Sequence, residues 1–290
     1  MRQISIAAAV FSLFSAAQAG SWGGAVTFNS AYNDFHIYYD DRDGSAGLQA
    51  TFEDISLTGS YTSGTHSVSV RLSGADDPDF DNFWGGNGNW DSNGDPCTPV
   101  TCPRSADRSE FTVTYTRSLR DGFSAYGGFY SGAITWKEVQ GRATREAAGN
   151  NPTIANICEV NGNTVQTTTD FENENFGLFI GGAYSRRFTD KLFGTARLAV
   201  VLDGEADVSE EYTCAGGAAP QIGATGTLFE GTASSLGLSL FYAIDGKSGL
   251  NLAYDTKSFS YDDGVDYWSG GTARTEESLD ILSFGYVFNF

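Results

Sequence analysis

Two histidines carry the main indication of acid–base chemistry in this sequence, because histidine readily exchanges protons near neutral pH. His36 lies in a stretch that also holds Asp34, Asp40 and Asp41, and a histidine beside a carboxylate has the composition of an acid–base pair. His66 directly follows a short polar turn. A structural hydrogen-bonding role is favoured for His36, so the sequence predicts no catalytic residue and no enzyme, with a surface hydrolase as the alternative.

Polar side chains in several segments alternate with apolar ones, a spacing that would place them inside a closed β-barrel. They are Arg71, Asn175, Arg187, Arg197, Asn251, Asp255, Lys257 and Asn289. Because buried charges are retained when they are paired, we expect pairing across the interior with acids such as Asp255 or Glu110. If the pairs leave gaps, the arginines and the lysine predict a narrow channel with a mild preference for anions.

Four cysteines, Cys97, Cys102, Cys158 and Cys214, predict two disulfides if the chain is exported. Three connectivities are possible, of which Cys97–Cys102 with Cys158–Cys214 is favoured. A metal site of four thiolates is disfavoured, because the surrounding segments contain no C-x-x-C pair.

Segment 91–95 places oxygen-bearing side chains at alternating positions around a glycine, as part of a Ca²⁺ loop does. The later bidentate glutamate is missing, so a solvated turn is favoured and no cofactor is predicted, with loop-bound Ca²⁺ or Mg²⁺ as the alternative. Nearby aromatic residues are expected either to plug the barrel mouth partly or to form an exposed binding patch. They are Phe80, Phe83, Trp84 and Trp90.

The elements that must position these residues are clearest at the C-terminus, where Phe284, Tyr286, Phe288 and Phe290 occupy every second position. Period two with aromatics on one face is typical of a lipid-facing β-strand. With Ser283 and Gly285, this stretch is similar to the insertion signal of Gram-negative outer-membrane proteins. That similarity implies outer-membrane localisation and contact between the last strand and the assembly machinery.

The N-terminus predicts export. Arg2, the apolar run 4–14 and the A-x-A box at 17–19 are typical of a secretory signal peptide over residues 1–19, leaving residues 20–290 as the barrel. The run is too short to span a hydrocarbon core of about 30 Å as a helix. No long apolar segment follows, so a soluble exported protein or a closed barrel is left.

Four tight polar turns, at 63–65, 120–122, 189–191 and 245–248, join alternating segments into β-hairpins. The connections between hairpins, at 75–109, 137–173, 203–232 and 262–277, are long and polar, and they contain all four cysteines. Short periplasmic turns and long extracellular loops predict an all-β, transmembrane, antiparallel up-and-down barrel of about ten strands, with eight to twelve possible. A phase change within 22–39 predicts a bulge in the first strand.

Composition agrees with a barrel and excludes one class of partner. The chain has 36 glycines and 14% aromatic residues, and its net charge of −19 argues against nucleic-acid binding. Acidic extracellular loops would lie beside lipopolysaccharide and its bridging divalent cations. A globular β-sandwich is the alternative fold, which the one-sided aromatic terminal strand disfavours.

Residues 20–290 resemble the porin and opacity-type superfamily of outer-membrane barrels, through the terminal signature and strand-like segments such as 176–184. The strand count also resembles omptin surface proteases, but no second His–Asp dipeptide occurs on a late strand, so that activity is not carried over. Two functions follow as hypotheses. The first is a narrow porin-like channel for small solutes or ions; the second is a non-conducting surface protein whose disulfide-braced loops bind a partner or lipopolysaccharide.

Overall fold

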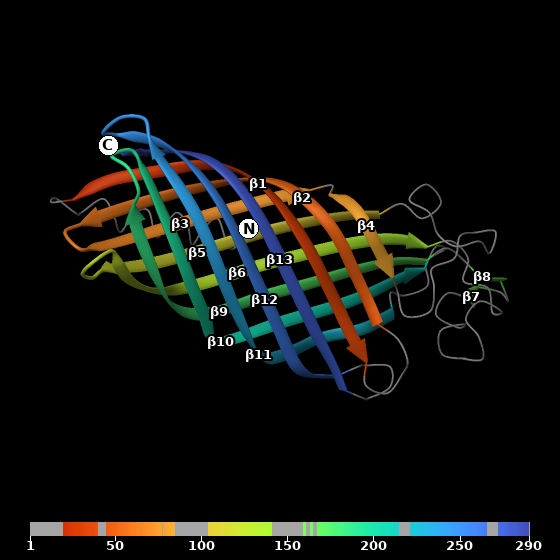
Figure 1. Ribbon diagram of the computed structural model, residues 1–290. Coiled ribbons are helices and arrows are strands. Elements are labelled where there is room, and N and C mark those ends of the chain that lie inside the picture. Colours follow the sequence, from red (N-terminus) through yellow and green to blue (C-terminus); the bar gives the residue numbers. More distant parts are fainter. Residues whose placement is uncertain are drawn as a thin grey trace.

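A computed structural model (Figure 1) describes residues 20–39, 45–76, 78–84, 104–140, 159–160, 163–164, 167–214, 221–265 and 272–289. No helix in these ranges is long and apolar enough to cross a bilayer. The elements are β1 (Ser21–Tyr39), β2 (Ser45–Ser63), β3 (His66–Asp76), β4 (Asp79–Trp84), β5 (Arg104–Ser118), β6 (Phe123–Gln140), β7 (Glu159–Val160), β8 (Asn163–Thr164), β9 (Thr167–Arg187), β10 (Leu192–Cys214), β11 (Gln221–Ala243), β12 (Ser248–Val265) and β13 (Thr272–Asn289).

One antiparallel sheet closes on itself, because β1 pairs with β13 on one side and with β2 on the other. The order around the barrel is β1-β13-β12-β11-β10-β9-β6-β5-β3-β2, while β7 and β8 pair separately. The short strand β4 pairs with β2 above the end of β3, so β3 and β4 share one strand position. The ten positions confirm the predicted fold class and strand number.

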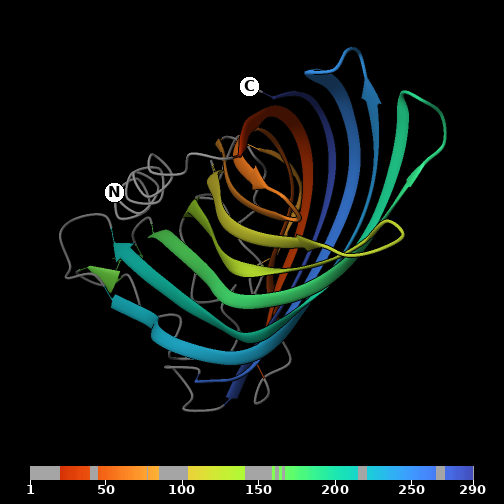
Figure 2. The same ribbon diagram turned by 90° about the vertical axis from the view of Figure 1, so that its left-hand side faces the viewer.

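Tight turns join the strands at one end of the barrel, which also holds the start of β1 and the end of β13 (Figure 2). Gly64 in the β2–β3 turn and Asp121 and Gly122 in the β5–β6 turn have φ values of 59°, 59° and 84°. In the β11–β12 turn, Asp245 accepts hydrogen bonds from the backbone of Lys247 and Ser248, which lower the pKa of its carboxyl below the ordinary value. We call this end the turn end and the opposite one the loop end.

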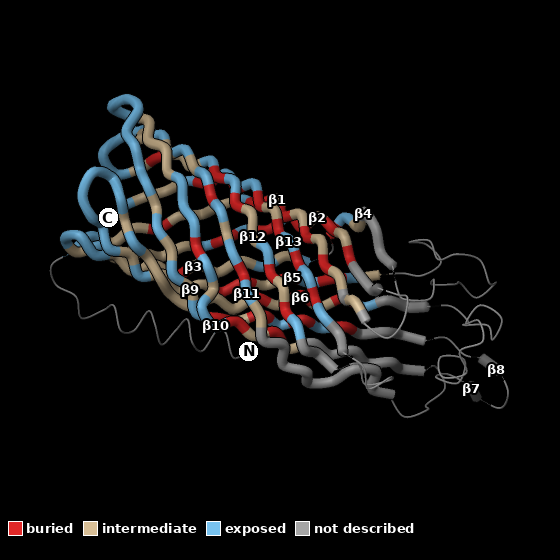
Figure 3. The backbone as a smooth tube through the Cα atoms, turned by 60° about the horizontal axis from the view of Figure 1, so that its bottom comes forward, coloured by how far each residue is buried: buried red, intermediate tan, exposed pale blue. Residues whose placement is uncertain are grey.

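The outward face is apolar only in the half nearest the turn end. Intermediate and exposed residues alternate along the strands there, and buried ones become frequent farther from the turn end (Figure 3). The exposed residues of this half are mainly large and apolar. This lipid band includes Phe28, Ile55, Leu57, Tyr115, Phe123, Leu178, Ile180, Leu198, Val200, Leu236, Leu238, Leu240, Leu252, Leu282, Phe284 and Tyr286. Along β11 it runs from Leu236 to the turn after Tyr242, close to the ~9–11 residues that cross a bilayer.

Above the lipid band the same strands continue with polar outward residues, among them Glu53, Glu172, Glu174, Asp262 and Glu276. The predicted long loops are therefore too long, since β5, β6 and β9 to β13 all extend into those segments, and β10 and β11 extend farthest. Even Cys214, expected in a loop, is the last residue of β10. Strands that rise above the lipid need no apolar outward residues, so the alternation that identifies membrane strands fades there.

The predicted bulge in the first strand is also wrong. β1 pairs in uninterrupted register with both neighbours, from Gly23 to Tyr38 on each side. Phe28 points outward into the lipid band, whereas Phe35 points inward and is fully buried. The aromatic phase changes because the outward side passes from lipid to water, while large apolar residues in the upper half fill the interior instead.

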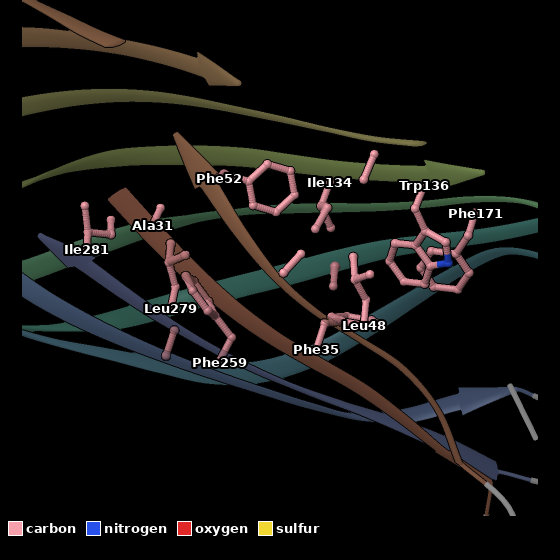
Figure 4. Packing of buried hydrophobic residues seen from close by; sticks show 14 of the residues in the cluster. Ala31, Phe35, Leu48, Phe52, Ile134, Trp136, Phe171, Phe259, Leu279 and Ile281 are labelled. Atoms are coloured by element: carbon pink, nitrogen blue, oxygen red, sulfur yellow. The ribbon is translucent and has the colours of Figure 1, made fainter. Parts of the chain in front are cut away.

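A hydrophobic core occupies the barrel interior above the lipid band. Its side chains come from strands all around the barrel and point toward one another across the lumen (Figure 4). The larger members are Phe35, Leu48, Phe52, Ile134, Trp136, Phe171, Phe259, Tyr261, Leu279 and Ile281. Phe80 of β4 packs against this core, in line with the plugging role considered for the aromatic residues of that region.

Candidate functional site

Beneath the hydrophobic core, ionised side chains cross the barrel in a layer formed by Asp54, Arg108, Glu110 and Lys257. Glu110 Oε2 accepts hydrogen bonds from Arg108 Nη2 at 2.9 Å and from Lys257 Nζ at 2.7 Å. β12, which carries Lys257, and β5, which carries Glu110, lie five positions apart in both directions around the barrel. The Lys257–Glu110 contact therefore spans the full width of the lumen.

Amides and hydroxyls connect this charged layer to the barrel wall. Asp54 accepts hydrogen bonds from Asn29 Nδ2 and, at 3.3 Å, from Arg108 Nη1. Asn29 Oδ1 in turn accepts hydrogen bonds from Ser283 Oγ at 2.7 Å and from Arg71 Nη2 at 3.4 Å. Glu110 and Asp54 are buried, and paired carboxylates of this kind are costly to disrupt.

Glu277 is a further buried carboxylate, held higher in the interior by amides instead of cations. It accepts hydrogen bonds from Nδ2 of Asn33, Asn175 and Asn173 at 2.6, 2.7 and 3.4 Å. No cation in the described part of the chain lies within 4.0 Å of it. Three amide donors from β1 and β9 thus join opposite walls through one carboxylate of β13.

Aromatic rings meet across the lumen above the charged layer. Phe35 on β1 and Phe171 on β9 are also five strand positions apart, yet their ring centroids lie 5.7 Å from each other. Trp136 on β6 stacks on Phe171 at 3.6 Å and meets Phe35 edge-on at 5.3 Å. Rings from opposite walls are therefore in contact across the lumen at this height.

A cavity of about 460 Å³ lies below the two layers, at the height of the lipid band. Its wall contains an ion pair in which Arg197 donates to Asp255 at 2.5 and 2.6 Å. Gly237 lies in register between the two residues, and a side-chain Cβ there would fall on Asp255 Oδ1 and Arg197 Nε. The glycine therefore gives this ion pair the space to cross β11.

The residues predicted to face the interior occupy three different places. Arg71, Arg197, Asn251, Asp255 and Lys257 line the cavity, whereas Asn175 lies higher, bound to Glu277. Arg187 and Asn289 lie at the turn end, outside the cavity lining. The Arg187 side chain is 57% exposed there and pairs with Asp190 at 2.5 Å.

Several interior residues were not predicted from the sequence. Arg108, Asn173 and Glu277 fall in segments that were assigned to loops, and Asp54 and Asn33 were not selected. The period-two run Asn29, Ala31, Asn33, Phe35 is a signal that identifies an inward face of polar and large residues.

The two histidines lie far from each other. His36 Nε2 contacts Asp34 Oδ1 at 2.8 Å on the outward face of β1, and its ring stacks on Tyr38. His66 Nδ1 contacts the Tyr115 hydroxyl at 2.6 Å near the turn end. Each histidine thus has a hydrogen-bonding partner in the barrel wall.

The cysteine and calcium hypotheses fall outside the described structure. Residues 1–19, Phe290, Cys97, Cys102, Cys158 and segment 91–95 are not among the described residues, and neither is the Cys214 side chain. Within the described ranges, no three His, Cys, Asp or Glu residues are grouped so as to hold a metal ion. Of the terminal signature, Tyr286 points outward and Gly285 faces the interior against Thr27 of β1.

Comparison with known proteins gives matches in structure alone. No family model and no curated protein sequence matches the chain. The outer membrane protease OmpT from Escherichia coli has a TM-score of 0.60 at 11% identity, covering 95% of this chain and 100% of OmpT. The translocator domain of the autotransporter NalP from Neisseria meningitidis scores 0.46 at 10% identity, covering 100% of this chain and 95% of that domain.

These observations define a class of protein. A closed ten-strand barrel satisfies its backbone hydrogen bonds internally, and its outward apolar band matches the thickness of a bilayer. The chain is an outer-membrane β-barrel protein of the Gram-negative type, with the fold of OmpT. Its turn end faces the periplasm and its loop end lies outside the cell.

Proposed function

We propose that the protein is a non-conducting outer-membrane protein that acts at the cell surface, through the barrel above the lipid band and its loops. The observation that carries this proposal is the contact of opposite walls at two heights, Lys257 with Glu110 and Phe35 with Phe171. A channel interior is normally polar and hydrated, whereas this one is filled above the lipid band by large apolar side chains.

The upper outward face supports a surface role. Its described outward residues are polar and largely acidic, so it is suited to water and to cation-bridged lipopolysaccharide instead of lipid chains. Partner or lipopolysaccharide binding by the loops is part of this proposal. Catalysis is not part of this proposal.

A narrow porin-like channel is the competing function, and the cavity inside the lipid band is the observation that favours it. Conduction would require both wall-to-wall contacts to separate at the same time. That motion would leave Glu110 and Lys257 without each other in the interior, which is costly.

Planar-bilayer recording of the refolded protein tests the proposal. We expect no stepwise current at any applied voltage, with insertion verified by protease protection of the same preparation. Stepwise currents of uniform size from the unmodified chain would favour the channel and contradict the closed lumen.

A further inference from the structure

The cavity below the charged layer is enclosed by mixed walls. Hydroxyl groups from four strands line one part of it, namely those of Thr27, Thr58, Thr112, Thr114, Thr116 and Ser235. Tyr126, Tyr130 and Phe179 line another part, and the Tyr126 and Phe179 rings meet edge-on at 6.2 Å. A volume of about 460 Å³ lies in the size range of small-molecule sites, and the wall offers both aromatic rings and polar groups to a ligand.

Most charges in the cavity wall are already paired. Arg197 is paired with Asp255, and Lys257 is paired with Glu110. Arg108, just above, shares Glu110 and also contacts Asp54. These groups satisfy one another and leave little affinity for an outside ligand.

Arg71 differs from the other cations of the cavity wall. Its one hydrogen bond is a long contact from Nη2 to Asn29 Oδ1 at 3.4 Å, and its buried Nε has no partner. No carboxylate of the described residues lies within 4.0 Å of its guanidinium. Arg71 therefore brings a positive charge and several unused N–H donors to the cavity.

The cavity is reached from the periplasmic side. The charged layer and the aromatic layer close the lumen toward the outside of the cell. The Arg197 side chain faces the interior but is 46% exposed, so the lumen at its height admits water. A ligand of the cavity would arrive from the periplasm.

We propose that this cavity binds a small organic monocarboxylate from the periplasm, with its carboxylate on Arg71 and its apolar body against Tyr126 and Phe179. A guanidinium presents parallel donors that match the two oxygens of a planar carboxylate. One unpaired cation matches one negative charge, which favours a monoanion over a phosphate dianion. The site is independent of the proposed surface function, because it lies on the opposite side of the closed layers.

The test is a ¹⁹F NMR titration of the refolded protein in a non-ionic maltoside detergent, with 4-fluorobenzoate and its neutral counterpart 4-fluorobenzyl alcohol. We expect the carboxylate to bind at least about tenfold more tightly, as a charge-assisted hydrogen-bond pair requires. Equal affinities for the two compounds would overturn the proposal, and so would the absence of 4-fluorobenzoate binding at concentrations of about 10 mM. Both outcomes are measured on the unmodified protein, so they do not depend on the folding of any variant.

Two arginine variants locate the site. Arg71→Met is expected to weaken 4-fluorobenzoate binding about tenfold and to leave the alcohol unchanged. Arg187→Met is the matched control, because Arg187 is exposed at the turn end, outside the cavity lining. Folding of each variant is checked by its resistance to unfolding in unheated SDS. Undiminished binding by folded Arg71→Met, or an equal loss in Arg187→Met, would contradict the assignment.

Discussion

Glu110 sets the charge balance of the barrel interior. Its buried carboxylate is the shared partner of Arg108 and Lys257, which come from its own strand and from the opposite wall. Removing one member of a buried ionic cluster leaves the others charged without compensation, which costs more than the pair contributes. The cluster therefore ties wall to wall through one residue.

Glu110→Gln is predicted to destabilise the folded barrel by about 3–5 kcal/mol, because two buried cations lose their common partner. Urea unfolding in lipid vesicles, followed by tryptophan fluorescence, measures this change. Glu174→Gln, an exposed outward position, is the control and should cost little. Adding Lys257→Met to Glu110→Gln should restore part of the loss; a strictly additive double variant would contradict the pairing.

Glu172 lies among like charges on the outward face above the lipid band. Partial burial and the neighbouring carboxylates of Glu174 and Asp207 raise the pKa of Glu172 above its ordinary value. A carboxyl whose pKa is raised by folding does not destabilise the fold while it is protonated in both states. It lowers the stability of the folded protein as pH rises through its unfolded and folded pKa values.

Glu172→Gln is accordingly predicted to stabilise the barrel at pH 7 by roughly 0.2–1 kcal/mol, the scale of like-charge contacts between strands. At a pH below the unfolded pKa of glutamate, about 4.3, the gain should vanish. Unfolding midpoints of both chains across this range provide the measurement, and a gain that persisted in acid would exclude the electrostatic explanation.

At the scale of the elements, each long strand has a lipid-facing part and a water-facing part. On β11, Leu240 lies in the lipid band while Thr232 lies above it, and both point outward. The two positions share a strand and an outward orientation, and they differ in the solvent that they meet.

Leu240→Arg is predicted to cost about 2–4 kcal/mol, since an arginine on the lipid face near the bilayer midplane is strongly unfavourable. Thr232→Arg, on the same strand, should cost much less. Unfolding in vesicles compares the two variants, and similar losses would mean that the membrane boundary lies higher on the barrel than the lipid band indicates.

At the scale of the whole molecule, two separate layers of side chains cross one lumen. The aromatic layer and the charged layer lie at different heights, and each joins strands on opposite sides of the barrel. Either layer alone leaves little space for hydrated ions, so closure is expected to survive the loss of one layer.

The triple variant Phe35→Ala, Trp136→Ala, Phe171→Ala and the single variant Lys257→Ala are each predicted to remain silent in planar bilayers. Their combination removes both wall-to-wall contacts and should produce stepwise currents. Currents from Lys257→Ala alone would show that the charged layer is the only barrier; silence of the folded combination would place a further barrier elsewhere in the interior.

The sequence by itself determined the class of protein. Alternation along segments such as 236–242 separates lipid-facing from inward residues, because side chains of a strand point to opposite faces in turn. The tight turns between alternating segments set the strand number and the direction of each strand. Arg71, Arg197, Asp255 and Lys257 could be placed inward on this basis alone.

Only the tertiary structure decided which inward residues meet. Lys257 and Glu110 are 147 positions apart, and their contact depends on the strand number and stagger of the closed barrel, which put β12 opposite β5. The height to which the strands rise above the membrane could not be predicted from the sequence either, because strands in water lack the apolar alternation of strands in lipid. The contacts between inward residues and the height of the strands together determine whether the lumen is open, and neither can be read from the local sequence pattern.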